Sequence, residues 1–239
     1  MSRIRRALSI VVLAASSAWG DVVTALTGSS LVVTGDSSAD TVAIEDAPSG
    51  LTVTGFGGTL VDGSSEAVTI PGVARLTVKL GNGDDRLTLT NVTLPSGFDL
   101  RLGRGNDSVV VDSVTVGSSR IRTGNGYDDV SVFGASRFDS LTVETSNGND
   151  FVEVDDAFVS QDLTIDTGAD EDYVTVFATT VANDMRLKLG NDDDILVLVD
   201  VVIDDDTHLD GENGDDVLFF DGYLWFGDDL DIDGFDDDW

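Results

Sequence analysis

The sequence contains no cysteine, and this absence excludes several classes of protein. The 239 residues can form no disulfide scaffold, no cysteine-ligated zinc or iron–sulfur site and no thiol nucleophile. Basic residues are also scarce, since 13 Lys and Arg stand against 45 Asp and Glu, for a net charge of -32. A surface with this charge repels phosphate, so we expect no nucleic-acid partner.

Long hydrophobic runs are missing as well. The apolar run over residues 7–15 follows Arg3, Arg5 and Arg6 and precedes small residues that end at Gly20. This order is typical of a secretory signal peptide, so residues 1–20 are predicted to be removed. A retained membrane anchor is the alternative, but the run is too short for a stable span. We therefore expect a mature chain with no membrane span, secreted or at the cell surface (periplasmic or extracellular).

What the sequence does contain is a repeat. Seven segments share the pattern Gly-x-Gly-x-Asp or a close variant, and their last Asp recurs with a nearly constant period of about 22 residues. The recurring residues are Asp85, Asp107, Asp128, Asp150, Asp172, Asp194 and Asp216. Residues 34–40 are a looser eighth copy, and residues 51–74 are interpreted as a coil that has lost its Asp turn.

Apolar residues recur around each of these Asp positions. They lie seven residues before it and two and four residues after it, as in Val143, Val152 and Val154 around Asp150. Alternation with period two predicts strands with one buried face, and the Gly/Asn/Asp clusters predict tight turns. Residues 21–218 are therefore predicted to form an all-β, single-domain parallel β-helix of about nine coils, with about 22 residues per coil. A propeller or a β-sandwich is the rival fold.

Stacked coils bring the recurring Asp residues into one column. At the usual strand spacing of about 4.8 Å, two neighbouring ionised carboxylates repel each other by about 3 kcal/mol. The position two residues earlier is Gly or Asp in every copy, residue types that tolerate a left-handed backbone. Carboxylate and carbonyl oxygens at close range are the ligands that Ca²⁺ takes, so the column is a candidate calcium site.

The turns resemble the repeats-in-toxin family of calcium-binding β-rolls, whose nonapeptide reads G-G-x-G-x-D-x-U-x. Residues 81–87 and 124–130 match the core of that pattern. The resemblance implies that the seven Asp residues bind Ca²⁺ between neighbouring coils. The chain departs from the family in two ways: the first Gly is Leu or Thr in six of seven copies, and each coil is longer and has one such turn. The resemblance covers about a quarter of residues 76–220.

A reading without metal stays open. Asp and Asn side chains in turns commonly accept hydrogen bonds from backbone N–H groups. The Asp column would then be a structural turn device, and Asn82, Asn125 and Asn147 fit this reading. Against it, hydrogen bonding alone leaves the charge of the column uncompensated, and further acids such as Asp84 and Asp129 adjoin it.

Charge and aromatic residues are unevenly distributed along the chain. Residues 75–122 hold seven bases and five acids, whereas residues 189–239 hold 19 acids and no base. Lys79, Arg101 and Arg122 are expected to stack in a basic stripe that binds an anionic polysaccharide or another copy of the chain, or that merely offsets local acids. Seven aromatics lie in residues 219–239, which we interpret as an acidic aromatic cap.

These features favour an exported, acidic β-helix that binds Ca²⁺ and acts as a structural, adhesion or binding module. The alternative is a β-helix lyase or hydrolase that acts on acidic polysaccharide. The residues give that alternative little support, because the only His, His208, is expected on an outward strand position and no nucleophile motif is present.

Overall fold

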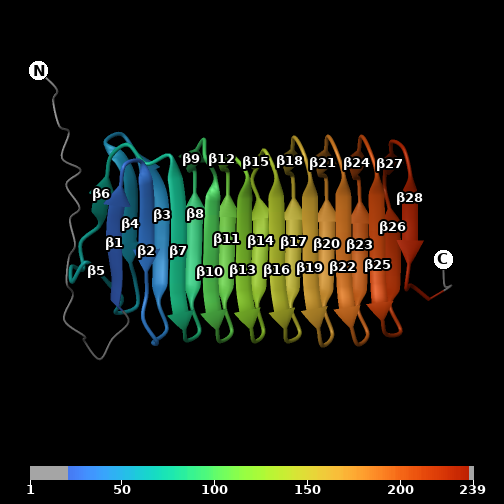
Figure 1. Cartoon of the computed structure of the whole chain (residues 1–239), viewed down its shortest axis with the longest axis horizontal. Coiled ribbons are helices and arrows are strands. Elements are labelled where there is room, and N and C mark those ends of the chain that lie inside the picture. Colours follow the sequence, from blue (N-terminus) through green and yellow to red (C-terminus); the bar gives the residue numbers. More distant parts are fainter. Residues whose placement is uncertain (1–20, 237–239) are drawn as a thin grey trace, which may run out of the picture.

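The structure is a computed structural model that describes residues 21–236. The predicted signal peptide and residues 237–239 lie outside this range. Within it the chain winds into a β-solenoid of three sheets, and every assigned element is a strand. Figure 1 shows the strands side by side along one long axis, in sequence order from residue 75 to the red C-terminal end; at the other end the teal strands within residues 60–70 lie outside the blue ones. The all-β parallel β-helix is thus confirmed.

Each coil contributes one strand to each sheet. Sheet 1 has eleven strands in the spatial order β5 (Leu60–Val61), β1 (Asp21–Thr27), β2 (Ser30–Thr34), β7 (Arg75–Asn82), β10 (Phe98–Arg104), β13 (Ser119–Asn125), β16 (Leu141–Asn147), β19 (Leu163–Ala169), β22 (Met185–Asn191), β25 (Thr207–Asn213) and β28 (Leu230–Asp233). Sheet 2 has ten strands in the order β6 (Val68–Ile70), β4 (Gly50–Gly55), β3 (Thr41–Ala47), β8 (Arg86–Thr90), β11 (Ser108–Asp112), β14 (Asp129–Phe133), β17 (Phe151–Asp155), β20 (Tyr173–Phe177), β23 (Ile195–Val199) and β26 (Val217–Asp221). Sheet 3 has seven short strands: β9 (Thr93–Leu94), β12 (Thr115–Val116), β15 (Arg137–Phe138), β18 (Phe158–Val159), β21 (Thr180–Val181), β24 (Val202–Ile203) and β27 (Trp225–Phe226).

The register of the parallel strands reproduces the repeat. Val143 of β16 pairs with Ile165 of β19, and Val152 of β17 pairs with Val174 of β20, in each case one full repeat further along the chain. Seven successive coils run from β7 to β27, compared with about nine expected. The difference is small and arises at the N-terminal end.

Residues 51–74 do not form a coil, which corrects the interpretation from sequence. β4 instead folds back antiparallel on β3, and β6 pairs antiparallel with β4. β1 and β2 likewise form an antiparallel hairpin. The physical reason is the connection length: only residues 48–49 separate β3 from β4, and only residues 28–29 separate β1 from β2, and such short loops can join only antiparallel strands.

The core fills the inside of the solenoid. The predicted apolar columns are buried, with Val143, Val152 and Val154 at 0% exposure, and their neighbours along each strand face outward. Burying one such side chain contributes about 1.5–3 kcal/mol. Stacking is therefore what stabilises the fold, because a single coil would leave its inner face in water.

The outer face of sheet 2 becomes apolar toward the C-terminal end. Phe151 and Tyr173 stack with ring centroids 5.7 Å apart, while Phe177 and Phe219 are 39% and 53% exposed. We call these four residues and the outward residues of β23 the apolar panel. At the end of the solenoid β26, β27 and β28 extend the three sheets, so Phe219, Phe220, Trp225 and Phe226 of the expected cap lie on a further rung.

No helix among residues 21–236 is long and apolar enough to cross a membrane.

Candidate functional site

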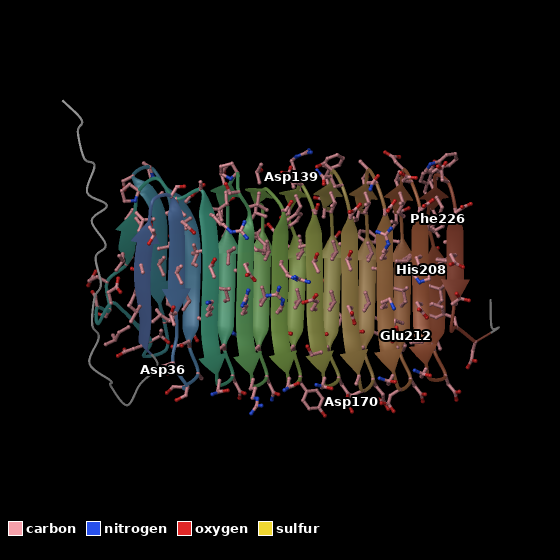
Figure 2. All side chains as sticks on the ribbon, viewed as in Figure 1. Asp36, Asp139, Asp170, His208, Glu212 and Phe226 are labelled. Atoms are coloured by element: carbon pink, nitrogen blue, oxygen red, sulfur yellow. The ribbon has the colours of Figure 1, made fainter. Side chains whose placement is uncertain are left out.

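The seven recurring Asp residues form one continuous row, which we call the aspartate ladder. Each lies in the turn that leads from a sheet 1 strand to the sheet 2 strand of the same coil. These turns follow one long edge of the molecule, where Figure 2 labels Asp36 and Asp170. The looser eighth copy also belongs to the row, because the N–H of Asp40 donates to Oδ1 of Asp85.

A hydrogen bond links each member of the ladder to the next. The backbone N–H of one Asp donates to the carboxylate Oδ1 of the Asp in the following coil, at 2.7–2.8 Å in all seven steps from Asp40 to Asp216. The carbonyl oxygen of each Asp accepts a separate bond within the parallel sheet, as from the N–H of Phe151 to Asp128. The side chains therefore work as turn acceptors, the role that the reading without metal requires.

The second oxygen of each carboxylate is left without a partner. Every ladder residue is 0–3% exposed, and one side-chain oxygen of each is buried without a hydrogen bond: Asp40 Oδ1 and Oδ2 of Asp85, Asp107, Asp128, Asp150, Asp172, Asp194 and Asp216. An unmade hydrogen bond on a buried polar atom is costly, and more so for a charge. A bound proton or cation would compensate these unpaired oxygens.

The carboxylate of each ladder Asp lies near the residue five positions before it in the chain. A Cβ added at Gly35 would lie 2.2 Å from Oδ2 of Asp40, and one at Gly211 would lie 2.6 Å from Oδ2 of Asp216. In the middle coils this position carries a buried threonine, and the nearby hydroxyls of Thr123, Thr145 and Thr167 partly offset the rise in the pKa of Asp128, Asp150 and Asp172.

Burial makes the ladder hard to ionise. Desolvation raises the pKa of Asp85 to about 8 and the pKa of Asp107, Asp150, Asp172 and Asp194 to about 7, from an ordinary value of 3.8. It raises the pKa of Asp40 to about 6. The hydrogen bond from the preceding backbone N–H opposes the shift, and in most coils the charge of a neighbouring Asp adds to it.

Close backbone approach explains the glycines of the turn. Gly103 has φ +121°, and a Cβ there would lie 1.7 Å from the carbonyl oxygen of Gly81 in the coil before. The position two residues before the ladder Asp is also left-handed in six of the seven coils, with φ +122° at Gly83 and +77° at Asp170. The expectation that this position tolerates positive φ is confirmed.

The exposed side of the turn is a second hydrogen-bond row. The N–H of Asn106 donates to Asp84 at 2.8 Å, and Asn147 donates from its amide to Asn125 at 2.6 Å. The acids beside the ladder are thus turn acceptors as well. Asn125 accepts from the side-chain amide of Asn147 in the next coil, which differs from the backbone N–H donor expected in the reading without metal.

The basic stripe is in register, but it is partly neutralised. Arg101 pairs in the sheet with Lys79 on one side and Arg122 on the other. Arg101 and Arg122 both form ion pairs with Asp99, at 2.7 and 3.1 Å, and Arg122 also pairs with Glu144 at 2.8 Å. Surface pairs of this kind contribute little to stability.

Sequence reasoning missed a second acidic cluster. Asp184, Asp205 and Asp206 lie at the turn between sheets 3 and 1, with carboxylate oxygens within 4.8 Å of one another. Burial and the neighbouring Asp206 and Asp184 raise the pKa of Asp205. The spacing signal was available, since Asp162, Asp184 and Asp206 recur with the same period as the ladder. We call Asp184, Asp205 and Asp206 the corner cluster.

His208 faces outward, as expected. It lies 3.2 Å from Asp231 and 3.7 Å from Asp210, beside a groove of about 450 Å³ that Arg186 and Asp229 also line.

Comparison of the chain with known proteins adds no family. No protein-family model matches it, and neither a curated protein nor a solved structure shows a significant similarity. The functional argument therefore rests on the residues themselves.

Proposed function

We propose that this chain is an exported structural or binding module, a rigid acidic rod that works at the cell surface or outside the cell. We further propose that Ca²⁺ bound along the aspartate ladder clamps neighbouring coils together. One observation carries the proposal: eight buried carboxylates stand in one row, and each has an oxygen without a hydrogen-bond partner.

The donor chemistry of the ladder fits Ca²⁺. The ion prefers oxygen ligands, and carboxylates are its commonest anionic ones. Asp85, Asp107, Asp128, Asp150, Asp172, Asp194 and Asp216 would hold the ions, with Asp40 at the N-terminal end. The hydroxyls of Thr123, Thr145 and Thr167 add oxygens in the middle coils. A bound ion would supply the positive charge that the row lacks.

A proton is the competing occupant of the same oxygens. With pKa values near 7, a large fraction of the ladder is neutral at physiological pH and can act as a hydrogen-bonded turn device without metal. The chain of N–H to Oδ1 bonds favours this second candidate. Because Ca²⁺ must displace these protons, calcium is expected to stabilise the fold more at high pH than at low pH.

The test is a set of thermal melts of residues 21–239 in chelator, Ca²⁺ or Mg²⁺, at about pH 6 and about pH 8. We expect Ca²⁺ to raise the melting temperature, more at the higher pH, with Mg²⁺ much weaker. A free Ca²⁺ concentration of 100 times the dissociation constant of one site adds about 2.7 kcal/mol to the free energy of unfolding.

Two variants locate the ion. Asp150→Asn changes the ladder, whereas Asp205→Asn with Asp206→Asn changes the corner cluster. Of the two, only Asp150→Asn should reduce the rise in melting temperature that Ca²⁺ causes. Equal melts of the unchanged protein in chelator and Ca²⁺ would reject the clamp and leave the turn device. Loss of the shift only in the corner variant would move the calcium site to that cluster.

The enzyme alternative requires one asymmetric group of side chains in a cleft. The groove beside His208 is the candidate, and incubation with pectate- or alginate-type polymers would reveal products if it were catalytic.

A further inference from the structure

The outward face of sheet 1 carries a column with one charged residue in every coil, beside a second outward column that holds Asp99, Arg120, Arg186 and Asp231 among uncharged residues. Successive strands place the residues of the first column directly beside one another, one in each coil from β7 to β28. In chain order this first column, which we call the charge column, consists of Lys79, Arg101, Arg122, Glu144, Asp166, Lys188, Asp210 and Asp233. Figure 2 labels His208 and Glu212, the residues two positions to either side of Asp210 on the same strand.

The signs along the charge column are antisymmetric about Asp166. Counting one strand outward from it, Glu144 is opposed by Lys188. The second strand outward pairs Arg122 with Asp210, and the third pairs Arg101 with Asp233. These three pairs join opposite charges. The charge column is therefore complementary to itself at these three steps after a half-turn that reverses the solenoid axis.

The sheet 1 strands that carry the charge column are also divided by charge, with bases toward the N-terminal end and acids toward the C-terminal end. β7, β10 and β13 contain six bases and one acid, whereas β16, β19, β22, β25 and β28 contain six acids and two bases. The ion pairs within the chain are local, for example Arg101 with Asp99. Asp233 in β28 is exposed.

We propose that this face docks against the same face of a second copy, with a two-fold axis in the interface, parallel to β19. Arg101 then faces Asp233 of the partner subunit, and Arg122 faces the partner's Asp210. Lys188 faces the partner's Glu144. Asp166 lies on the axis beside the partner's Asp166, and Asp99 faces the partner's Asp231, so these like-charged contacts oppose docking and the three opposite-charge pairs have to outweigh them. A two-fold interface of this kind uses the same surface on both copies.

The size of the face is sufficient for a specific interface. Seven strands about 4.8 Å apart, each about 20 Å long, cover roughly 700 Å² per copy, or about 1,400 Å² in the dimer. Specific interfaces start near this area, at about 1,200 Å². Contact across charged faces is screened by salt, so the dimer is expected to dissociate at high ionic strength.

A second copy explains more of the face than an anionic polysaccharide does. A polyanion would contact the basic strands β7, β10 and β13 and be repelled by the acidic strands beside them. A second copy uses both halves of the face and the order of signs between them. The apolar panel on sheet 2 offers a different surface for self-association, so the experiment has to separate the two.

Sedimentation velocity of the mature chain is the first measurement. We expect a dimer at about 50 mM salt that dissociates at about 500 mM. Arg101→Glu should weaken dimerisation by about tenfold or more, and adding Asp233→Arg in the same chain should restore it. A monomer at every salt concentration would overturn the proposal, and binding of a sulfated oligosaccharide by that monomer would assign the basic strands to polysaccharide.

The absence of cysteine permits a geometric test. With a bis-maleimide that spans about 10 Å, the distance between packed sheets, Asp166→Cys should cross-link to itself because it lies on the axis. Lys188→Cys should cross-link to Glu144→Cys in a mixture but not to itself. Phe177→Cys on the apolar panel is the control. Cross-linking of the Phe177→Cys variant, or a dimer that Phe177→Lys abolishes, would place the interface on sheet 2 and reject the charged face.

Discussion

The backbone N–H of Asp128 donates a 2.8 Å hydrogen bond to Oδ1 of Asp150 in the next coil, while Oδ2 of Asp150 is buried without a partner. One oxygen of this carboxylate thus stabilises the stack and the other destabilises it. The two effects can be separated by substitution, because an amide keeps the acceptor and removes the charge.

Asp150→Asn is expected to stabilise the fold at about pH 8 in chelator, since the carbonyl oxygen of the amide still accepts the N–H of Asp128. Asp150→Ala removes that acceptor and should cost about 1–3 kcal/mol. Chemical denaturation measures both changes, with the exposed Glu171→Gln as the control of equal charge change. A destabilised Asn variant would mean that the carboxylate charge itself is needed.

Stability in chelator should fall as the pH rises from about 4 to about 8. At pH values well below 3.8 the ladder is neutral in both the folded and the unfolded chain. Above it the unfolded carboxylates ionise near 3.8, while Asp150 and Asp172 keep their protons up to about 7 and Asp85 up to about 8. The folded state therefore binds more protons over this range, and its stability declines with pH. Thermal melts across the range measure it, and a rise in melting temperature over this interval would contradict the shifts.

Gly103→Ala should prevent folding or cost more than about 3 kcal/mol. The added Cβ would lie 1.7 Å from the carbonyl oxygen of Gly81, and φ of +121° is unfavourable for alanine. Gly28→Ala is the matched control, because Gly28 is also left-handed but has no atom within 4 Å of its Cβ position. Circular dichroism and denaturant melts should show a change of about 1 kcal/mol there.

Neighbouring residues of β23 should respond differently to truncation. Leu196 is fully buried in the core, and Leu196→Ala is expected to cost about 2–5 kcal/mol. Val197 points outward, and Val197→Ala should cost less than about 1 kcal/mol. Urea denaturation of both variants checks the alternation, and equal losses would show that the outer face of sheet 2 is covered by another surface.

Much of the fold could be predicted because the repeat is nearly invariant in length. The constant step between Asp150, Asp172, Asp194 and Asp216 fixes the register of every parallel strand between them. The antiparallel start could not be predicted in this way. Residues 51–74 have the same alternating apolar pattern as a coil, and only the two-residue turn between β3 and β4 sets the direction in which they run.

The sequence by itself determined the stacked coil and the membership of the aspartate ladder, because periodicity alone places equivalent residues side by side. The tertiary structure decided which way those side chains face. It buries every ladder carboxylate, pairs one oxygen of each with a backbone N–H, and leaves the other free. It also brings Asp205 and Asp206 against Asp184 of the preceding coil. The pKa values and hydrogen bonds of these carboxylates depend on burial and on contacts between coils. Both arise only when the coils stack around a common core.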